Sequence, residues 1–162
     1  MDAGRAVLIT GAFCLALALI LCLSPLMYPY GSMVGLGGTP GIMDRPVSLS
    51  ELPYAIGDLL CHQDPERSIM LNGNQMPMCV RDVGILIGLS IGLLTCVISG
   101  FVPRTRMHII VILALCSVTI VEWGVENFIQ LPGIVRGVSG CISGFGAGMI
   151  GAYAIERTYE EG

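Results

Sequence analysis

The stretch VGILIGLSIGLLTCVISGFV, residues 83–102, contains 20 consecutive residues without a charged side chain. A helix of roughly 20 apolar residues crosses the hydrocarbon core of a bilayer, so this stretch predicts a transmembrane helix. Small residues recur along it every four positions, at Gly84, Gly88, Gly92, Cys96 and Gly100. A stripe of small residues lets the backbone of a second helix approach closely. The stretch therefore predicts both a membrane span and the face by which that span packs.

The rest of the chain is similarly apolar. Of the 162 residues, 54% are hydrophobic and only 12% are charged, and the mean hydropathy is +0.79. Three further stretches of low charge, at 6–26, 107–131 and 134–155, are long enough to cross a bilayer. We therefore expect an all-α integral membrane protein with four transmembrane helices in a single membrane domain, residues 1–162. A net charge of −4 without a basic run excludes a nucleic-acid partner and leaves membrane lipid as the expected surroundings.

A long loop, residues 28–82, separates the first two predicted spans. Its first part, YPYGSMVGLGGTPG, is too rich in Gly and Pro for a regular element. The following SELPYAIGDLLCH segment has apolar residues at helical spacing, which favours a short interfacial helix ending near Cys61. Beyond it, the Asn72-Gly73 pair is typical of a tight hairpin turn. We expect this loop to form an ordered cap over one end of the bundle.

Four spans bring several charged residues to the end of the bundle that carries the cap. Glu122 and Glu126 are one helical turn apart and share one face of the third span. Arg81 precedes the second span and Arg136 lies near the start of the fourth. Because an ionisable side chain at membrane depth is costly without a partner, we expect a glutamate to pair with an arginine here.

The side of the membrane occupied by the cap is predicted only weakly, because the arginines divide equally between the two sides. The eight arginines fall into two sets of four: Arg5, Arg104, Arg106 and Arg157 on the side of the termini, and Arg45, Arg67, Arg81 and Arg136 on the side of the cap. We favour the plasma membrane with both termini in the cytoplasm, because Arg104 and Arg106 occupy one very short loop.

The fourth span repeats the small-residue pattern of the second. Gly140, Gly144, Gly148 and Ala152 form a matching stripe, so these two spans are expected to touch, either within one chain or between chains. The segments CVRDVGILIG and IVRGVSGCISG also look alike, which suggests a parallel internal repeat. A homo-oligomer could form through these seams, whose glycines are Gly84, Gly88, Gly92, Gly140, Gly144 and Gly148.

The residues gathered at the cap end suggest a metal site. Thiolates and an imidazole from Cys61, His62 and Cys79 suit zinc, with Glu122 or Glu126 as a further ligand. Such a centre could activate water for hydrolysis of an anionic or lipid-linked substrate, with the free glutamate as the base. In this hypothesis the catalytic residues are Glu122, Glu126, Arg81 and Arg136, and the substrate contacts are Gln63, Arg67 and Asp82.

Two other classes of function remain open. Cys61 and Cys79 can instead form a disulfide that closes the hairpin, either as a staple or in a thiol oxidoreductase. No CxxC motif supports the latter. A small transporter, channel or assembly subunit is the third class, in which the glutamates move a cation or the glycine seams bind a partner.

Two motifs resemble a family of uncharacterised small membrane proteins, domain of unknown function 2085. They are CHQ-x-P-E-R-S at residues 61–68 and P-x-C-x-R-x-x-G at residues 77–84, with a looser pattern at Gln130, Arg136 and Gly140. The resemblance covers roughly the C-terminal two thirds of the chain. Where the family has an acidic-Gly pair, this chain has Glu122-Trp123-Gly124. The resemblance implies a membrane protein of archaeal or bacterial type and no particular activity.

Overall fold

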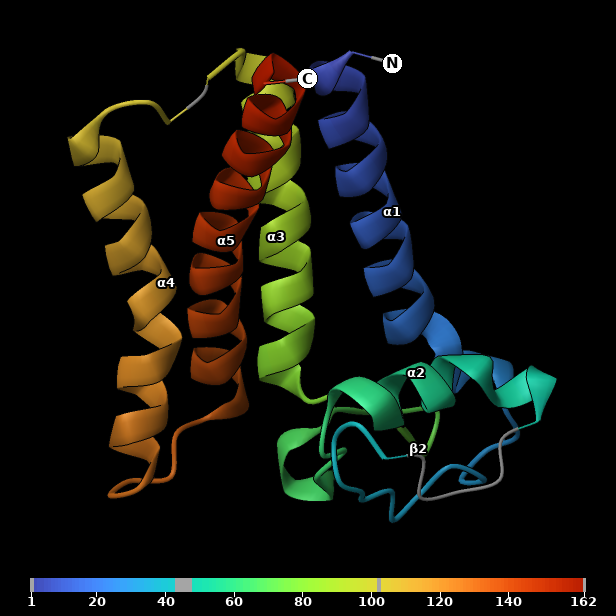
Figure 1. Cartoon of the computed structure of the whole chain (residues 1–162). Helices are drawn as coiled ribbons and strands as arrows, with labels where there is room; N and C mark the ends of the chain where they lie inside the picture. The colour runs from blue at the N-terminus through green and yellow to red at the C-terminus, as the bar shows by residue number, and fades with distance from the viewer. Residues whose placement is uncertain (1, 43–47, 102, 162) are drawn as a thin grey trace.

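The chain folds into four long helices and a cap, as a computed structural model describes for residues 2–42, 48–101 and 103–161. The helices are α1 (Ala3–Leu23), α3 (Val80–Ser99), α4 (Arg106–Glu126) and α5 (Gly133–Glu161). All four are long and apolar enough to cross a membrane, which confirms the predicted fold class. They stand in the order α4, α5, α3, α1, with both termini at the end opposite the cap (Figure 1).

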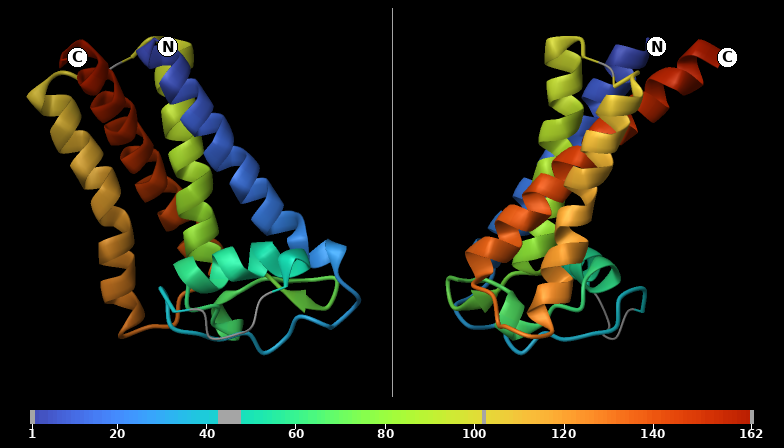
Figure 2. Two further views of the ribbon diagram at one scale, coloured as in Figure 1. Left: turned by 45° about the vertical axis from the view of Figure 1, so that its right-hand side comes forward. Right: turned by 90° about the vertical axis from the view of Figure 1, so that its left-hand side faces the viewer.

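The cap consists of short elements between α1 and α3. Its helices are η1 (Ser24–Met27), η2 (Leu49–Glu51), α2 (Leu52–Leu60) and η3 (Pro65–Arg67). Strands β1 (Met70–Leu71) and β2 (Asn74–Gln75) pair antiparallel. Asn72 and Gly73 between them have φ of 53° and 68°, the left-handed values that a tight hairpin turn requires. The expected short helix and hairpin are therefore both present, and α2 lies across the end of the bundle (Figure 2). Residues 43–47 of the predicted loop, Arg45 among them, lie outside the described residues.

A network of buried amide side chains holds the cap together. The Asn74 amide donates to the carbonyls of Pro25 and Pro29 at 2.9 and 3.0 Å. The Gln75 amide donates to the carbonyl of Gln63, whose own amide donates to the carbonyl of Pro77 at 3.0 Å. Buried backbone carbonyls in irregular segments need such donors, since no helix or strand supplies them. These amides are why a loop rich in Gly and Pro is ordered.

Helices α3 and α5 pack through the two glycine stripes within one chain. A Cβ atom added at Gly88 would lie within 3.0 Å of the backbone of Cys141, and one at Gly144 equally close to Ile85. The contacts are reciprocal, and the matched glycines are each 56 residues apart: Gly84 with Gly140, Gly88 with Gly144, and Gly92 with Gly148. Reciprocal contact between two helices that both start at the cap indicates a local two-fold axis along the bundle, as the predicted repeat requires. Because the stripes are buried here, these glycines are not a free surface for the oligomer that the sequence suggested.

Helix α4 is the least buried of the four and attaches to α5 through polar contacts. The Thr119 hydroxyl and backbone N–H both lie within 3.0 Å of the Ser143 hydroxyl oxygen. Ser143 in turn donates to the Leu115 carbonyl at 3.1 Å. These bonds fix the rotation of α4, and so direct Glu122, one turn towards the cap, inward.

Candidate functional site

Two thiols and a carboxylate meet where the cap joins the bundle. Cys61 directly follows α2, Cys79 directly precedes α3, and Asp82 lies in the first turn of α3. One ligand atom from each of these residues lies within 4.8 Å of the other two. The Cys79 thiol donates to Asp82 Oδ2 at 3.0 Å, and the Cys79 backbone N–H donates to Cys61 Sγ at 3.3 Å. We call these three residues the thiol cluster.

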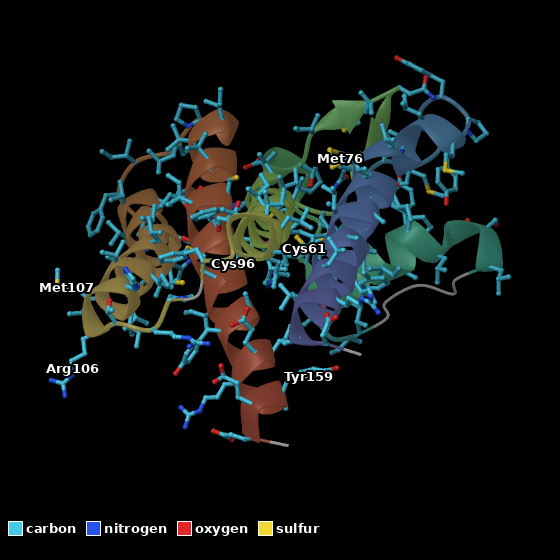
Figure 3. The ribbon with its side chains drawn as sticks, turned by 90° about the horizontal axis from the view of Figure 1, so that it is seen from above. Cys61, Met76, Cys96, Arg106, Met107 and Tyr159 are labelled. Atoms are coloured by element: carbon cyan, nitrogen blue, oxygen red, sulfur yellow. The ribbon has the colours of Figure 1, made fainter. Side chains whose placement is uncertain are left out.

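The position of the thiol cluster follows from local sequence and packing. Helix α2 ends at Leu60, and Cys61 already has extended backbone with φ −140° and ψ 151°. Cys61 then packs with Met78 against Leu21 of α1, in a small core that side chains of α3 complete. Figure 3 shows Cys61 between α1 and α3 when the bundle is viewed along its axis. The cluster is therefore part of the junction and not of an outer loop.

The environment gives the two thiols different acidities. Contact with the Cys79 side chain lowers the pKa of Cys61, and the hydrogen bond from the Cys79 backbone N–H adds to this effect. The pKa of Cys79 is raised by its contact with Cys61, by burial and by the negative charge of Asp82. Both cysteines are free thiols in the structure.

A second group of side chains, beside the thiol cluster, forms a buried ion network. Arg81 makes a two-pronged contact with Glu122, from Nε to Oε2 at 2.7 Å and from Nη2 to Oε1 at 2.9 Å. Arg81 also binds Glu126, which binds Arg136 in turn. The side chains of all four residues are at most 13% exposed. The expected pairing of glutamate and arginine is confirmed, and the network ties α3, α4 and α5 together.

A cavity of about 420 Å³ opens beside both groups. The thiol cluster, His62, Trp123 and three arginines are part of its lining. Three groups of residues meet here: the lining of this cavity, the lining of the polar cavity next to it, and the ion network. Together they contain two more carboxylates than arginines. The carboxylates are Asp64, Glu66, Asp82, Glu122 and Glu126, and the arginines are Arg67, Arg81 and Arg136. The site thus carries excess negative charge even with both thiols protonated.

Several predicted site residues occupy places other than those expected. Gln63 is fully buried and binds backbone carbonyls in the cap, so its side chain does not reach the cavity as a substrate contact would require. Glu122 and Glu126 are committed to arginines and do not join the thiol cluster. His62 lines the cavity but is exposed and is not one of the three clustered ligands.

Asp82 and Trp123 are the residues that sequence reasoning placed least well. Asp82, expected to bind substrate, is instead hydrogen-bonded to Cys79. The sequence signal for this contact was the spacing of three residues between Cys79 and Asp82 at the start of a helix, because positions i and i+3 share a face. Trp123 lines the cavity from α4. It had no predicted role at the site, and the only sequence signal for its place there was its position next to Glu122.

The architecture and the site define a small polytopic membrane protein with a thiol and carboxylate cluster at one end. The family of predicted membrane proteins designated DUF2085 matches residues 61–150, so the chain belongs to that family. The chain is also similar to "Uncharacterized protein MJ1492" of Methanocaldococcus jannaschii, with 30% identity over 98 residues. That match covers 57% of this chain and 61% of the relative, about three fifths of its length. No solved structure matches the chain.

Proposed function

We propose that this protein binds a divalent transition metal ion, zinc in the first instance, at Cys61, Cys79 and Asp82. The observation that carries the proposal is the approach of one ligand atom from each residue to within 4.8 Å of the others. Three donors from two separate segments of the chain converge on one point, which a single ion could occupy. The local excess of negative charge further favours a cation.

The donor set suits zinc better than a hard cation. Two thiolate sulfurs and one carboxylate oxygen are soft and borderline ligands, whereas Mg²⁺ and Ca²⁺ prefer oxygen alone. Zinc sites with three protein ligands keep a fourth position for water or a further ligand. His62 lines the same cavity and is the candidate for that position.

The geometry supports binding and not the hydrolysis that the sequence suggested. A hydrolytic site needs a general base, and both glutamates are held by arginines. An anionic head group needs unpaired cations, yet Arg67 contacts Asp64 at 3.4 Å and the other two arginines bind glutamates. The proposal is therefore limited to a metal-binding membrane protein.

Metal analysis combined with thiol counting tests this proposal. Protein purified under reducing conditions is titrated with zinc, and with cobalt, whose absorption reports coordination by thiolates. We expect one ion per chain with thiolate-to-cobalt absorption, and loss of both signals in Cys61→Ser and Cys79→Ser. Cys141→Ser, a free cysteine of α5, is the matched control and should keep both signals. Failure of the reduced wild-type protein to bind either ion would disprove the proposal.

A second candidate function, thiol-disulfide exchange, is favoured by one specific observation. Cys61 and Cys79 are both free thiols and their sulfur atoms lie within 4.8 Å of each other, so an oxidant could join them in a disulfide after a small movement. Oxidised protein should then lose two thiols per chain and regain them on reduction. A dithiol that stays reduced in the presence of a thiol oxidant would exclude this function.

A further inference from the structure

The cap carries a row of exposed leucines beside the bundle. Leu49 is 97% exposed, Leu52 55%, Leu59 44% and Leu60 53%. They lie on η2 and α2, within twelve consecutive positions of the chain. We call these four residues the apolar edge. Four exposed leucines on one short segment are unusual on a surface that faces water.

The opposite side of α2 is firmly attached to the rest of the cap. Tyr54, Ala55 and Asp58 are buried there. A Cβ atom added at Gly57 would lie within 3.0 Å of the backbone of Pro77. Helix α2 therefore cannot turn its leucines inward without losing this contact.

Contacts with the end of α1 hold the apolar edge at one depth. The Tyr28 hydroxyl donates to the carbonyl of Ser50 at 2.5 Å, and its ring packs edge to face on Tyr54 at 5.1 Å. Tyr28 comes directly after the first candidate span, Ala3–Met27. These contacts hold the segment that carries Leu49 and Leu52 next to the end of that span.

The apolar edge continues the lipid-facing surface of the first span. Leu23, Leu26 and Met27 at the end of that span are all more than half exposed. Helix α2 lies across the bundle axis and extends outward past α1 (Figure 3). A helix in this position, apolar on one side and anchored on the other, lies parallel to the membrane surface and in contact with it.

From this geometry we infer that the bilayer itself covers the apolar edge, with Leu49, Leu52, Leu59 and Leu60 seated between the lipid head groups and the acyl chains. The inference is independent of the proposed metal binding. It places Cys61, which directly follows Leu60, near the depth of the head groups. A second copy of the chain would cover the same leucines but would exclude lipid from them.

Depth-dependent fluorescence quenching in lipid nanodiscs tests this inference. Leu52→Trp and Leu59→Trp are made singly in the full chain with Trp123→Phe, which removes the one native tryptophan. Brominated acyl chains report contact with lipid, and aqueous iodide reports contact with water. Phe13→Trp on α1 is the lipid reference, and Glu66→Trp on the exposed η3 is the aqueous reference. Leu49→Trp, at the most exposed position, replaces either variant that fails to fold.

We expect both leucine variants to be quenched by brominated lipid nearly as strongly as Phe13→Trp. Their quenching by iodide should be several-fold weaker than that of Glu66→Trp. Strong iodide quenching without lipid quenching would place the edge in water and overturn the inference. Protection from both quenchers would also overturn it, since the edge would then be covered by protein.

Discussion

The thiol cluster and the ion network meet at the start of α3, where Asp82 and Arg81 are neighbours, but the two groups differ in their charge balance. In the ion network two arginines meet two glutamates, and charges from α3, α4 and α5 are matched at short range. In the thiol cluster two sulfurs and a carboxylate face one another, and no member is positively charged. The difference shows that polar residues at one end of a bundle can separate into a charge-balanced contact and a group of donors without a cation. Helical periodicity brings this about, because Asp82 lies three positions after Cys79, the N-cap of α3, and so turns back towards it, whereas Arg81 points elsewhere.

The largest expected effect tests whether the ion network is structural. Arg81→Met leaves Glu126 paired with Arg136 but removes the guanidinium from buried Glu122, which keeps a hydrogen bond from the Ser139 hydroxyl. Removal of one member of a buried ion pair typically destabilises by about 3–5 kcal/mol. We expect a loss of this size in the free energy of unfolding, measured by denaturant titration in detergent micelles. Arg104→Met is the control, because its pair with Glu160 is more than 60% exposed and should contribute below about 1 kcal/mol. Equal losses in the two variants would contradict a structural network.

Exchanging the charges of Glu126 and Arg136 also tests whether the ion network is structural, with a somewhat smaller expected effect. Glu126→Arg and Arg136→Glu should each destabilise, because each brings like charges together. Combined, they restore an opposite pair between α4 and α5, although Arg81 then faces a new arginine. We expect the double variant to be more stable than the sum of the single losses by about 1 kcal/mol, in the range for residues in contact. An additive result in the same titrations would mean that the two side chains do not interact directly.

The sequence predicts the ion network better than the thiol cluster, for physical reasons. Charges at membrane depth have few acceptable partners, so the spacing of Glu122 and Glu126 and the number of spans are enough to predict their pairing. The thiol cluster depends on how the cap folds, which a buried amide network decides. Gln63 and Gln75 in that network bind backbone carbonyls far along the chain, and no local pattern marks those partners.

The third prediction tests whether the thiol cluster is a ligand site. Cys61→Ser replaces a soft donor by a hard one and should weaken zinc binding by more than about 100-fold, beyond the 10–100-fold typical of outer-shell partners. Competition with a chromophoric chelator measures the change. The free energy of unfolding of the metal-free protein should fall less than in Arg81→Met, since a thiol and a hydroxyl are nearly equal in size. A large loss of stability with unchanged zinc affinity would show that Cys61 is a packing residue.

The smallest expected effect concerns His62, which lines the cavity but is not one of the three clustered ligands. The conformation of the backbone at Cys61 explains this separation. Cys61 is extended, and successive side chains of an extended backbone point in different directions, so the imidazole is separated from the thiol although both residues line the cavity. We expect His62→Ala to weaken zinc binding about 10-fold, the low end of the range for supporting partners, and to leave stability unchanged. Asp82→Asn, which keeps the shape of an actual cluster member, should weaken binding more than His62→Ala in the same chelator competition. If the order is reversed, the imidazole is the third ligand, and Asp82 serves only to accept the hydrogen bond from Cys79.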